Sequence, residues 1–422
     1  MPEYGLDHFA AGTIPQQPSP ETLKVRTTPK SRRPSHDSFS EEETSSLVDG
    51  VAYLSLCASG TTDTAQEPFY IVSSSGATIA RMIQASIFQQ SKSPATASSP
   101  ASTGPDVLRP SFGQLPAVRD FSDDISEFPP RTQALALFSV FFDRLHTRWP
   151  ILDRKVYYQL FEKQYDQGAL PLIQRSILHL IYAVSARFLQ LMKKPCNVDP
   201  QRHFVAAVEP MDYILEQHNL ATVQFLVLLA IHGQRSPYGA GAWSQVRYAI
   251  TLCIELGLHR KRTDNSPAHN ARDLEIRRRV FWACYCLDRT ISLLLGRTFA
   301  IADRDINVEL PHSSPEYWEL TSTGSPPEDG QGWSNALPFI HIIKLRKIQS
   351  KIHRTVFRVD KDVFTTDPEE RARLDGKIDA IRADLDEWLR TTPSPPRDSS
   401  SVTWMYDPEG SYHHNSRDFF LL

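Results

Sequence analysis

The chain has 422 residues, which is enough for one large domain or two medium-sized domains with additional tails. Its 46 Lys and Arg nearly balance its 49 Asp and Glu, and the net charge of −3 gives no whole-chain argument for binding nucleic acid. The five cysteines have no framework spacing, and the first segment lacks the basic and then apolar pattern of a secretion signal. These features exclude a disulfide-rich secreted class, so we expect a soluble protein of the cytosol or nucleus.

Residues 1–45 are polar and rich in proline, and we expect them to form a disordered tail. The tail contains a small basic cluster, made of Lys24, Arg26, Lys30, Arg32 and Arg33. Short basic runs serve as nuclear-import signals or contact phosphates, and they also occur simply as solvated charged tails. The sequence leaves these alternatives open.

Residues 46–90 form a short, partly ordered segment, in which apolar residues first recur at helical spacing and a strand-like run follows at Phe69–Val72. Gly76 then precedes a second helical pattern, but the glycine spacing and lysine of a phosphate-binding loop are missing, which favours a turn. Residues 91–130 are rich in Ser, Pro and Ala and are predicted to be a linker.

Helical spacing dominates from Arg131 onward. One apolar face consists of Leu135, Phe138, Phe141, Phe142 and Leu145, and a second of Ile173, Ile177, Leu180, Ile181, Val184, Phe188 and Met192. The longest apolar run, residues 220–231, is too short to span a bilayer, and its helix is predicted to end near Gly233. The next apolar stripe, residues 243–256, is predicted to stop at Gly257 as a C-terminal cap.

The strongest helical pattern begins after Pro267, with Asn270 as a plausible N-cap and Asp273 in the first turn. Apolar residues then recur at intervals of four, four, three, four and three up to Leu294, and the pattern predicts a largely buried helix that ends at Gly296. The apolar stripe of this helix consists of Ile276, Val280, Cys284, Leu287, Ile291 and Leu294, and it is widened by Phe281, Trp282 and Tyr285. Residues 298–311 are predicted to be a loop, and two further helices cover residues 339–356 and 378–388. The predicted fold class is all-α, built from packed helical hairpins.

The sequence contains only weak candidates for catalytic or metal-binding residues. Cys284 and Cys286 project roughly 200° apart on a helix and cannot share one metal ion, and the pair His413 and His414 is also a weak ligand candidate. The histidines His179, His203, His218, His232 and His259 are scattered, and most of them are expected at the surface or the edge of the core. No nucleophile elbow, dinucleotide fingerprint or phosphate-binding loop occurs in the sequence. We therefore predict no catalytic, cofactor-binding or metal-binding residues and no enzyme.

Charged groups in the helical region have structural interpretations. Asp303 and Asp305 follow Gly296 in a loop, where an acidic pair more often caps a helix or binds backbone amides. Asp123 and Asp124 lie in the linker and not in a helix that faces a cavity. The basic run 277–279 spreads around its helix, which favours a solvated helix start over a DNA contact, and Glu275 and Arg279 are predicted to pair at i,i+4.

The helix and loop over residues 278–311 resemble the signature of the fungal-specific transcription factor domain, the middle or regulatory region of zinc binuclear cluster regulators. The motifs that carry the resemblance are RRVFWACYCLDR at 278–289, LLLGR at 293–297 and FAIADRDINVELP at 299–311, with weaker likeness at 222–224, 242–243, 256–260, 141–152 and 70–76. The likeness covers residues 65–310 well and the remainder loosely. Thr298 stands where the family usually has proline.

The resemblance implies a transcription regulator of the nucleus that acts through a helical regulatory domain at residues 131–422. It also implies partners in the transcription machinery or a full-length paralogue, promoter DNA, and no membrane. Family members bind zinc through a six-cysteine cluster that begins Cys-x2-Cys-x6-Cys, and the five cysteines here lack that spacing, so we expect no zinc in this chain. Compared with the family, we expect the chain to be truncated at both ends and the domain at 131–422 to be truncated at its C-terminus. Two alternatives remain: an interaction protein that modulates a full-length regulator, and a helical enzyme of a fungal metabolic pathway.

Overall fold

The computed structural model describes residues 127–166, 170–236, 239–261, 271–313, 336–356 and 367–393, together with the backbone of residues 60–61. Its helices are α3 (Arg131–Val140), the π-helical turn η1 (Phe141–Leu145), α4 (Arg154–Asp166), α5 (Leu172–Leu191), α6 (Pro200–Val208), α7 (Met211–Glu216), α8 (Leu220–Gly233), α9 (Ala242–Glu255), α10 (Ala271–Leu295), the 3-10 turn η2 (Asp303–Asp305), α11 (Ala336–Thr355) and α12 (Pro368–Arg390). The extended pieces are two-residue strands, β1 (Gly60–Thr61) and β2 (Gly239–Ala240), which pair antiparallel. The all-α fold class is confirmed.

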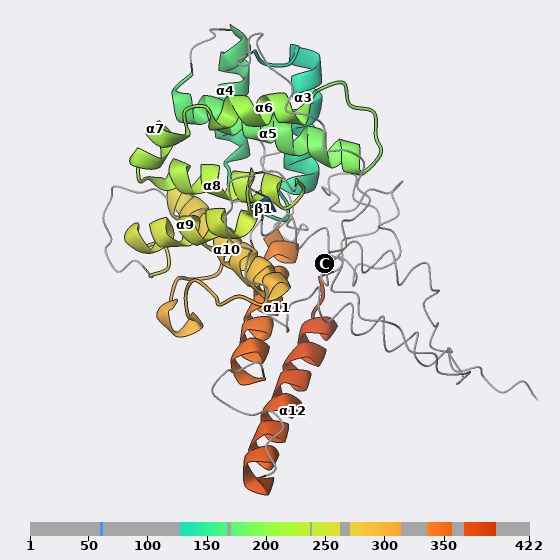
Figure 1. Cartoon of the computed structure of the whole chain (residues 1–422), viewed down its shortest axis with the longest axis vertical. Coiled ribbons are helices and arrows are strands. Elements are labelled where there is room, and N and C mark those ends of the chain that lie inside the picture. The colour runs from blue at the N-terminus through green and yellow to red at the C-terminus, as the bar shows by residue number, and fades with distance from the viewer. Residues whose placement is uncertain are drawn as a thin grey trace, which may run out of the picture.

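The helices pack mainly on their neighbours in the chain. Helix α5 contacts α3, α6 and α8, and the series then continues from α8 to α9, α9 to α10, α10 to α11 and α11 to α12. Figure 1 shows α3 to α10 gathered in one body, from which the α11–α12 pair extends as a long arm. The arm is therefore joined to the body through the contacts between α10 and α11.

Helix α8 lies at the centre of the body because its sequence is apolar all round. Every residue from Thr222 to Gly233 is buried. Its start is fixed by a capping box, in which the side chain of Asn219 accepts a hydrogen bond from the backbone N–H of Thr222 at 3.0 Å. The two predicted glycine terminators are also observed: Gly257 and Gly296 have φ values of 65° and 67°, the left-handed conformation that ends a helix.

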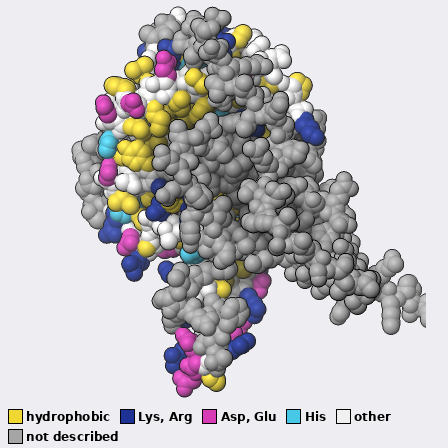
Figure 2. All heavy atoms as spheres, in the orientation of Figure 1, with side chains coloured by type: hydrophobic (Ala, Val, Ile, Leu, Met, Phe, Trp, Pro, Cys, Tyr) yellow, Lys and Arg dark blue, Asp and Glu magenta, His cyan; other side chains and the backbone are white. Residues whose placement is uncertain are grey.

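Helix α12 is the opposite case, since it buries only Ile381 and Trp388. Its exposed face carries ion pairs within the helix, such as Arg373–Glu369 and Arg390–Glu387. Figure 2 shows charges of both signs interspersed at the end of the arm. This surface is typical of a solvated helix.

Several predicted details are wrong or incomplete. The sequence pattern places Leu135 on the first apolar face, but its side chain is 41 % exposed, and Leu137 is buried in its place. The sequence patterns did not predict α4, α6 or α7. The tail at 1–45, most of the segment at 46–90, the linker up to residue 126 and the proposed N-cap Asn270 lie outside the described residues.

Candidate functional site

Helix α10 presents three large side chains towards the loop that follows it and towards α11. Trp282, Tyr285 and Arg289 are spaced by three and four residues, which places them on one face of the helix. Trp282 and Arg289 are fully buried, and the guanidinium of Arg289 lies 4.1 Å from the ring centroid of Tyr285. Arginine at this depth requires a partner for its charge.

That partner is the adjacent Asp288, whose carboxylate receives a hydrogen bond from Arg289 at 2.7 Å. The pair also holds the loop at residues 297–311. Arg289 donates to the carbonyl oxygen of Ile301 at 2.7 Å, and Asp288 accepts from the backbone N–H of Ala300 at 3.1 Å. Burial raises the pKa of Asp288 above its usual value, and the nearby Arg289 opposes that shift.

The far end of the loop is attached at Trp282, whose indole N–H donates to the carbonyl oxygen of Glu309 at 2.8 Å. Between these attachments, Asp303 connects the loop to two helices. Its carboxylate accepts hydrogen bonds from the hydroxyl of Tyr285 at 2.6 Å and from the hydroxyl of Ser350 on α11. The position of the loop is thus set by side chains on both α10 and α11.

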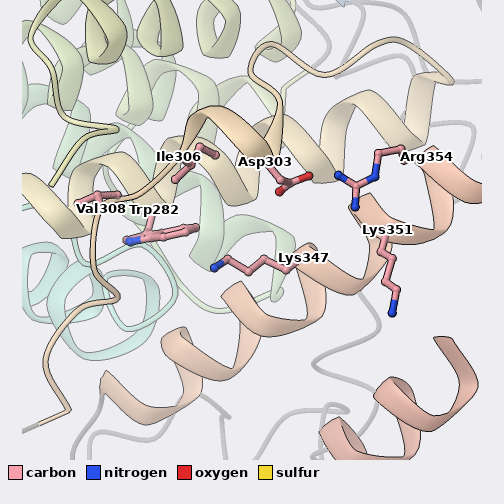
Figure 3. A pocket seen from close by; sticks show the side chains of 7 residues that line it. All are labelled: Trp282, Asp303, Ile306, Val308, Lys347, Lys351 and Arg354. Carbon is pink, nitrogen blue, oxygen red and sulfur yellow. The ribbon is translucent and has the colours of Figure 1, made fainter. Parts of the chain in front are cut away.

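A hollow of about 240 Å³ lies between this loop and α11, and we name it the α10–α11 hollow. Its lining residues are Trp282, Asp303, Ile306, Val308, Lys347, Lys351 and Arg354. In Figure 3, Lys347, Lys351 and Arg354 follow one another along α11, while Trp282 and the loop residues form the opposite wall. Three cations and one carboxylate give the lining an excess of positive charge.

The cations have unequal surroundings. The ammonium of Lys347 lies 4.7 Å from the ring centroid of Trp282, and burial lowers its pKa, while the charge of Asp303 acts in the opposite direction. Lys351 pairs with Asp384 of α12 at 2.6 Å. Arg354 is exposed, and no acidic side chain among the described residues pairs with it. The hollow can therefore hold an anion, and the lining residues that the structure describes include no serine, cysteine or histidine.

The structure changes the interpretation of several charged residues. Asp303 does not cap η2, because no side-chain cap hydrogen bond occurs there. The predicted i,i+4 pair of Glu275 and Arg279 is present at 3.1 Å, but both side chains are buried. Arg277 donates to the carbonyl oxygen of Leu256 at 3.2 Å, so the basic run is a set of structural contacts and not a solvated helix start.

Three of the scattered histidines are buried, contrary to expectation: His179, His203 and His232. The Nδ1 atoms of His179 and His203 lie 3.0 Å apart. The thiols of Cys253 and Cys284 are also adjacent, with their sulfur atoms 3.8 Å apart in the core. Among the described residues, no three His, Cys, Asp or Glu side chains are grouped so that they could hold a metal.

The basic cluster of Lys24, Arg26, Lys30, Arg32 and Arg33 lies outside the described residues, as do Asp123, Asp124, His413 and His414. No described helix combines the length and the apolar composition needed to cross a membrane. Sequence reasoning missed the α10–α11 hollow altogether. The signal that could have indicated it is the i, i+4, i+7 spacing of Lys347, Lys351 and Arg354 on one helix face.

A comparison with known families decides the identity of the domain. The profile of the fungal specific transcription factor domain matches residues 138–390, which is more than half of the chain and runs from α3 to the end of α12. The chain belongs to this family. It therefore carries the middle domain of fungal zinc-cluster transcription regulators and belongs with transcription factors, not with enzymes.

Similar proteins include the "negative regulator of pleiotropic drug resistance STB5" of Candida glabrata, 27 % identical over 63 % of this chain and 26 % of that protein. The "ABC-transporter-regulating transcription factor" of Aspergillus oryzae is 25 % identical over 63 % of this chain and 29 % of its own length. The "positive regulator of purine utilization" of Emericella nidulans is 24 % identical over 72 % of this chain and 34 % of its own length. The match thus spans about a quarter to a third of these relatives. No solved structure matches the chain.

The zinc cluster that the family implies does not fit the cysteines present here. None of the five follows another at the Cys-x2-Cys spacing. In the described part of the chain, Cys253 and Cys284 are adjacent, but they are completely buried, and burial raises the pKa of Cys284 well above that of an ordinary thiol. A zinc ligand must be a thiolate, which this environment disfavours.

Proposed function

We propose that the chain regulates transcription by RNA polymerase II in the nucleus, acting through its helical domain on a set of metabolic or transport genes. The observation that carries the proposal is the family match over residues 138–390, which coincides with the body and the arm. The names of the relatives, which concern drug resistance, ABC transporters and purine utilization, support control of such genes.

In this proposal the domain does not read DNA itself. Specific recognition requires a rigid element that presents side chains to base edges. The family's six-cysteine module is such an element, and the 422 residues do not contain its spacing. The helical domain would then act through proteins of the transcription machinery or by binding a regulator that carries a zinc cluster. The basic residues 24–33 would supply nuclear import or weak phosphate contacts.

A tethering experiment tests the regulatory activity. The 422-residue chain is fused to a heterologous DNA-binding domain in a fungal cell, and transcription of a reporter with the matching sites is measured against the DNA-binding domain alone. We expect transcription to change several-fold, in either direction. An unchanged reporter, with the fusion present in the nucleus, would contradict the proposal.

A second experiment tests the prediction that the helical domain does not recognise a specific DNA sequence. The untethered chain is incubated with a pool of genomic fragments at low and at near-physiological salt. We expect only sequence-independent retention, which fades with salt because phosphate contacts release counterions, and which disappears when residues 1–40 are deleted. One enriched motif at near-physiological salt that survives the deletion would show that the helical domain reads DNA.

A further inference from the structure

The α10–α11 hollow has the features of a binding site for a small anion. Lys347, Lys351 and Arg354 are four and three residues apart on α11, so their side chains share one face of the helix. The single carboxylate of the lining, Asp303, is already engaged by Tyr285, Ser350 and the more distant Arg289. The positive charge of the hollow is therefore only partly compensated within the described structure.

Two of the cations are available to a ligand. Lys351 is paired with Asp384 at 2.6 Å, whereas Lys347 contacts the face of Trp282 and Arg354 has no acidic partner in the described part of the chain. Ammonium and guanidinium groups form strong hydrogen bonds with carboxylate or phosphate, and arginine can bind such a group through two parallel bonds. An anion in the hollow would gain contacts to both.

Apart from Asp303, the opposite wall is apolar. Ile306 and Val308 of the loop and the ring of Trp282 line the hollow facing α11. The volume of the hollow, about 240 Å³, is large enough for several waters, since one water needs roughly 10–15 Å³. The volume is somewhat below the range of pockets for drug-sized ligands, about 300–1,000 Å³. The size suits a compact molecule and excludes a folded partner.

We propose that the α10–α11 hollow binds a small organic anion. Its carboxylate or phosphate group lies between Lys347 and Arg354, and its apolar part lies against the partly exposed side chains of Ile306 and Val308. Such a ligand bridges the body and the arm, because the loop belongs to the body and α11 belongs to the arm. Any effect of the ligand on transcription rests on the proposed function, whereas the binding itself does not.

Phenyl phosphate is a suitable probe because it joins an anionic group to an apolar ring. The purified 422-residue chain is titrated calorimetrically at near-physiological salt with phenyl phosphate, inorganic phosphate and phenol. We expect saturable binding of one phenyl phosphate per chain, weaker binding of inorganic phosphate and none of phenol. Equal affinity for phenyl phosphate and inorganic phosphate would overturn the apolar part of the proposal, and no saturable binding of any probe would overturn the site.

Matched variants locate the binding. Arg354→Gln and Lys347→Met each remove one charged contact and are expected to weaken phenyl phosphate binding about tenfold or more. The control is Arg371→Gln, an exposed arginine of α12 that does not line the hollow, and it should bind as the parent does. Retained affinity in both hollow variants, or an equal loss in the control, would overturn the proposal.

Thermal unfolding of each variant shows whether it is folded. Arg354 is exposed, so Arg354→Gln should melt close to the parent, whereas Lys347→Met also loses the contact with the ring of Trp282 and should melt slightly lower while remaining folded. Because binding is measured on the purified chain, a silent reporter in the tethering experiment contradicts the proposed function and leaves the site standing. Absent binding with an active reporter overturns the site alone.

Discussion

Replacing Arg289 by methionine is expected to cost roughly 3–5 kcal/mol of unfolding free energy, as breaking a buried ion pair does. Methionine retains most of the apolar stem but removes the guanidinium. The carboxylate of Asp288 then stays buried with only the backbone N–H of Ala300 as a described partner, and the carbonyl oxygen of Ile301 loses its donor.

The structure supports the upper part of that range. Arg289 is fully buried, its bonds to Asp288 and Ile301 are both 2.7 Å, and its guanidinium lies 4.1 Å and 4.4 Å from the ring centroids of Tyr285 and Phe299. One kcal/mol shifts the melting temperature of a domain of this size by about 2–4 °C, so a loss of about 4–5 kcal/mol corresponds to roughly 8–20 °C.

Thermal and urea unfolding, followed by circular dichroism, measure the effect. The matched control is Arg304→Met in the same loop, whose side chain is 85 % exposed and whose replacement should change stability by less than about 0.5 kcal/mol. The double variant Asp288→Asn with Arg289→Met removes the stranded charge and should recover part of the loss. If Arg289→Met unfolds like Arg304→Met, the buried pair does not hold the loop and the reasoning is wrong.

Three further predictions concern the rest of the domain. Trp282→Ala and Leu287→Ala should each lower the unfolding free energy by about 2–5 kcal/mol, as large core truncations do, and a melt within a degree of the parent would place α10 outside the core. Native protein should react with a thiol reagent at Cys196 before the other described cysteines, which are buried, and uniform labelling before unfolding would contradict this. Acid should destabilise the fold, because between pH 6.5 and about 4 the histidines of the unfolded chain bind protons that the buried histidines of the folded chain do not. The urea midpoint should therefore fall from pH 7 to pH 5, and a constant midpoint would refute the burial of these histidines. The histidines concerned have pKa values that burial lowers to about 3 or about 4, and they are His146, His179, His203 and His232.

Strong helical periodicity was sufficient to predict the long helices of the fold. Helices α5, α9, α10 and α11 each show an apolar stripe several turns long, and Gly257 and Gly296 end two of them as predicted. Helix α4 was missed because only Tyr157, Phe161 and Gln164 are buried in its thirteen residues. Helix α6 has a capping signal in the sequence, Asp199 followed by Pro200, but just nine residues to support it.

The candidate site could not be predicted in the same way. The apolar pattern of α10 correctly predicts that Trp282 is buried, but nothing in that pattern indicates that Lys347, on another helix, lies over its ring. The cations of α11 look like an ordinary solvated face in the sequence. Whether these cations line a hollow depends on where the loop at 297–311 lies. That position is set by tertiary hydrogen bonds such as the one from Trp282 to Glu309.

The buried ion pair and the hollow are therefore parts of one arrangement. Apolar residues of similar volume often replace a buried pair without loss of stability, so we infer that Asp288 and Arg289 serve chiefly to fix the loop. The loop supplies Asp303, Ile306 and Val308 to the hollow, although Arg289 itself does not line it. Arg289→Met, at a temperature where it remains folded, should consequently bind phenyl phosphate more weakly than Arg304→Met does. Equal affinities in the two folded variants would show that the hollow keeps its shape without the pair, and that the hydrogen bonds from Trp282, Tyr285 and Ser350 are sufficient to position the loop.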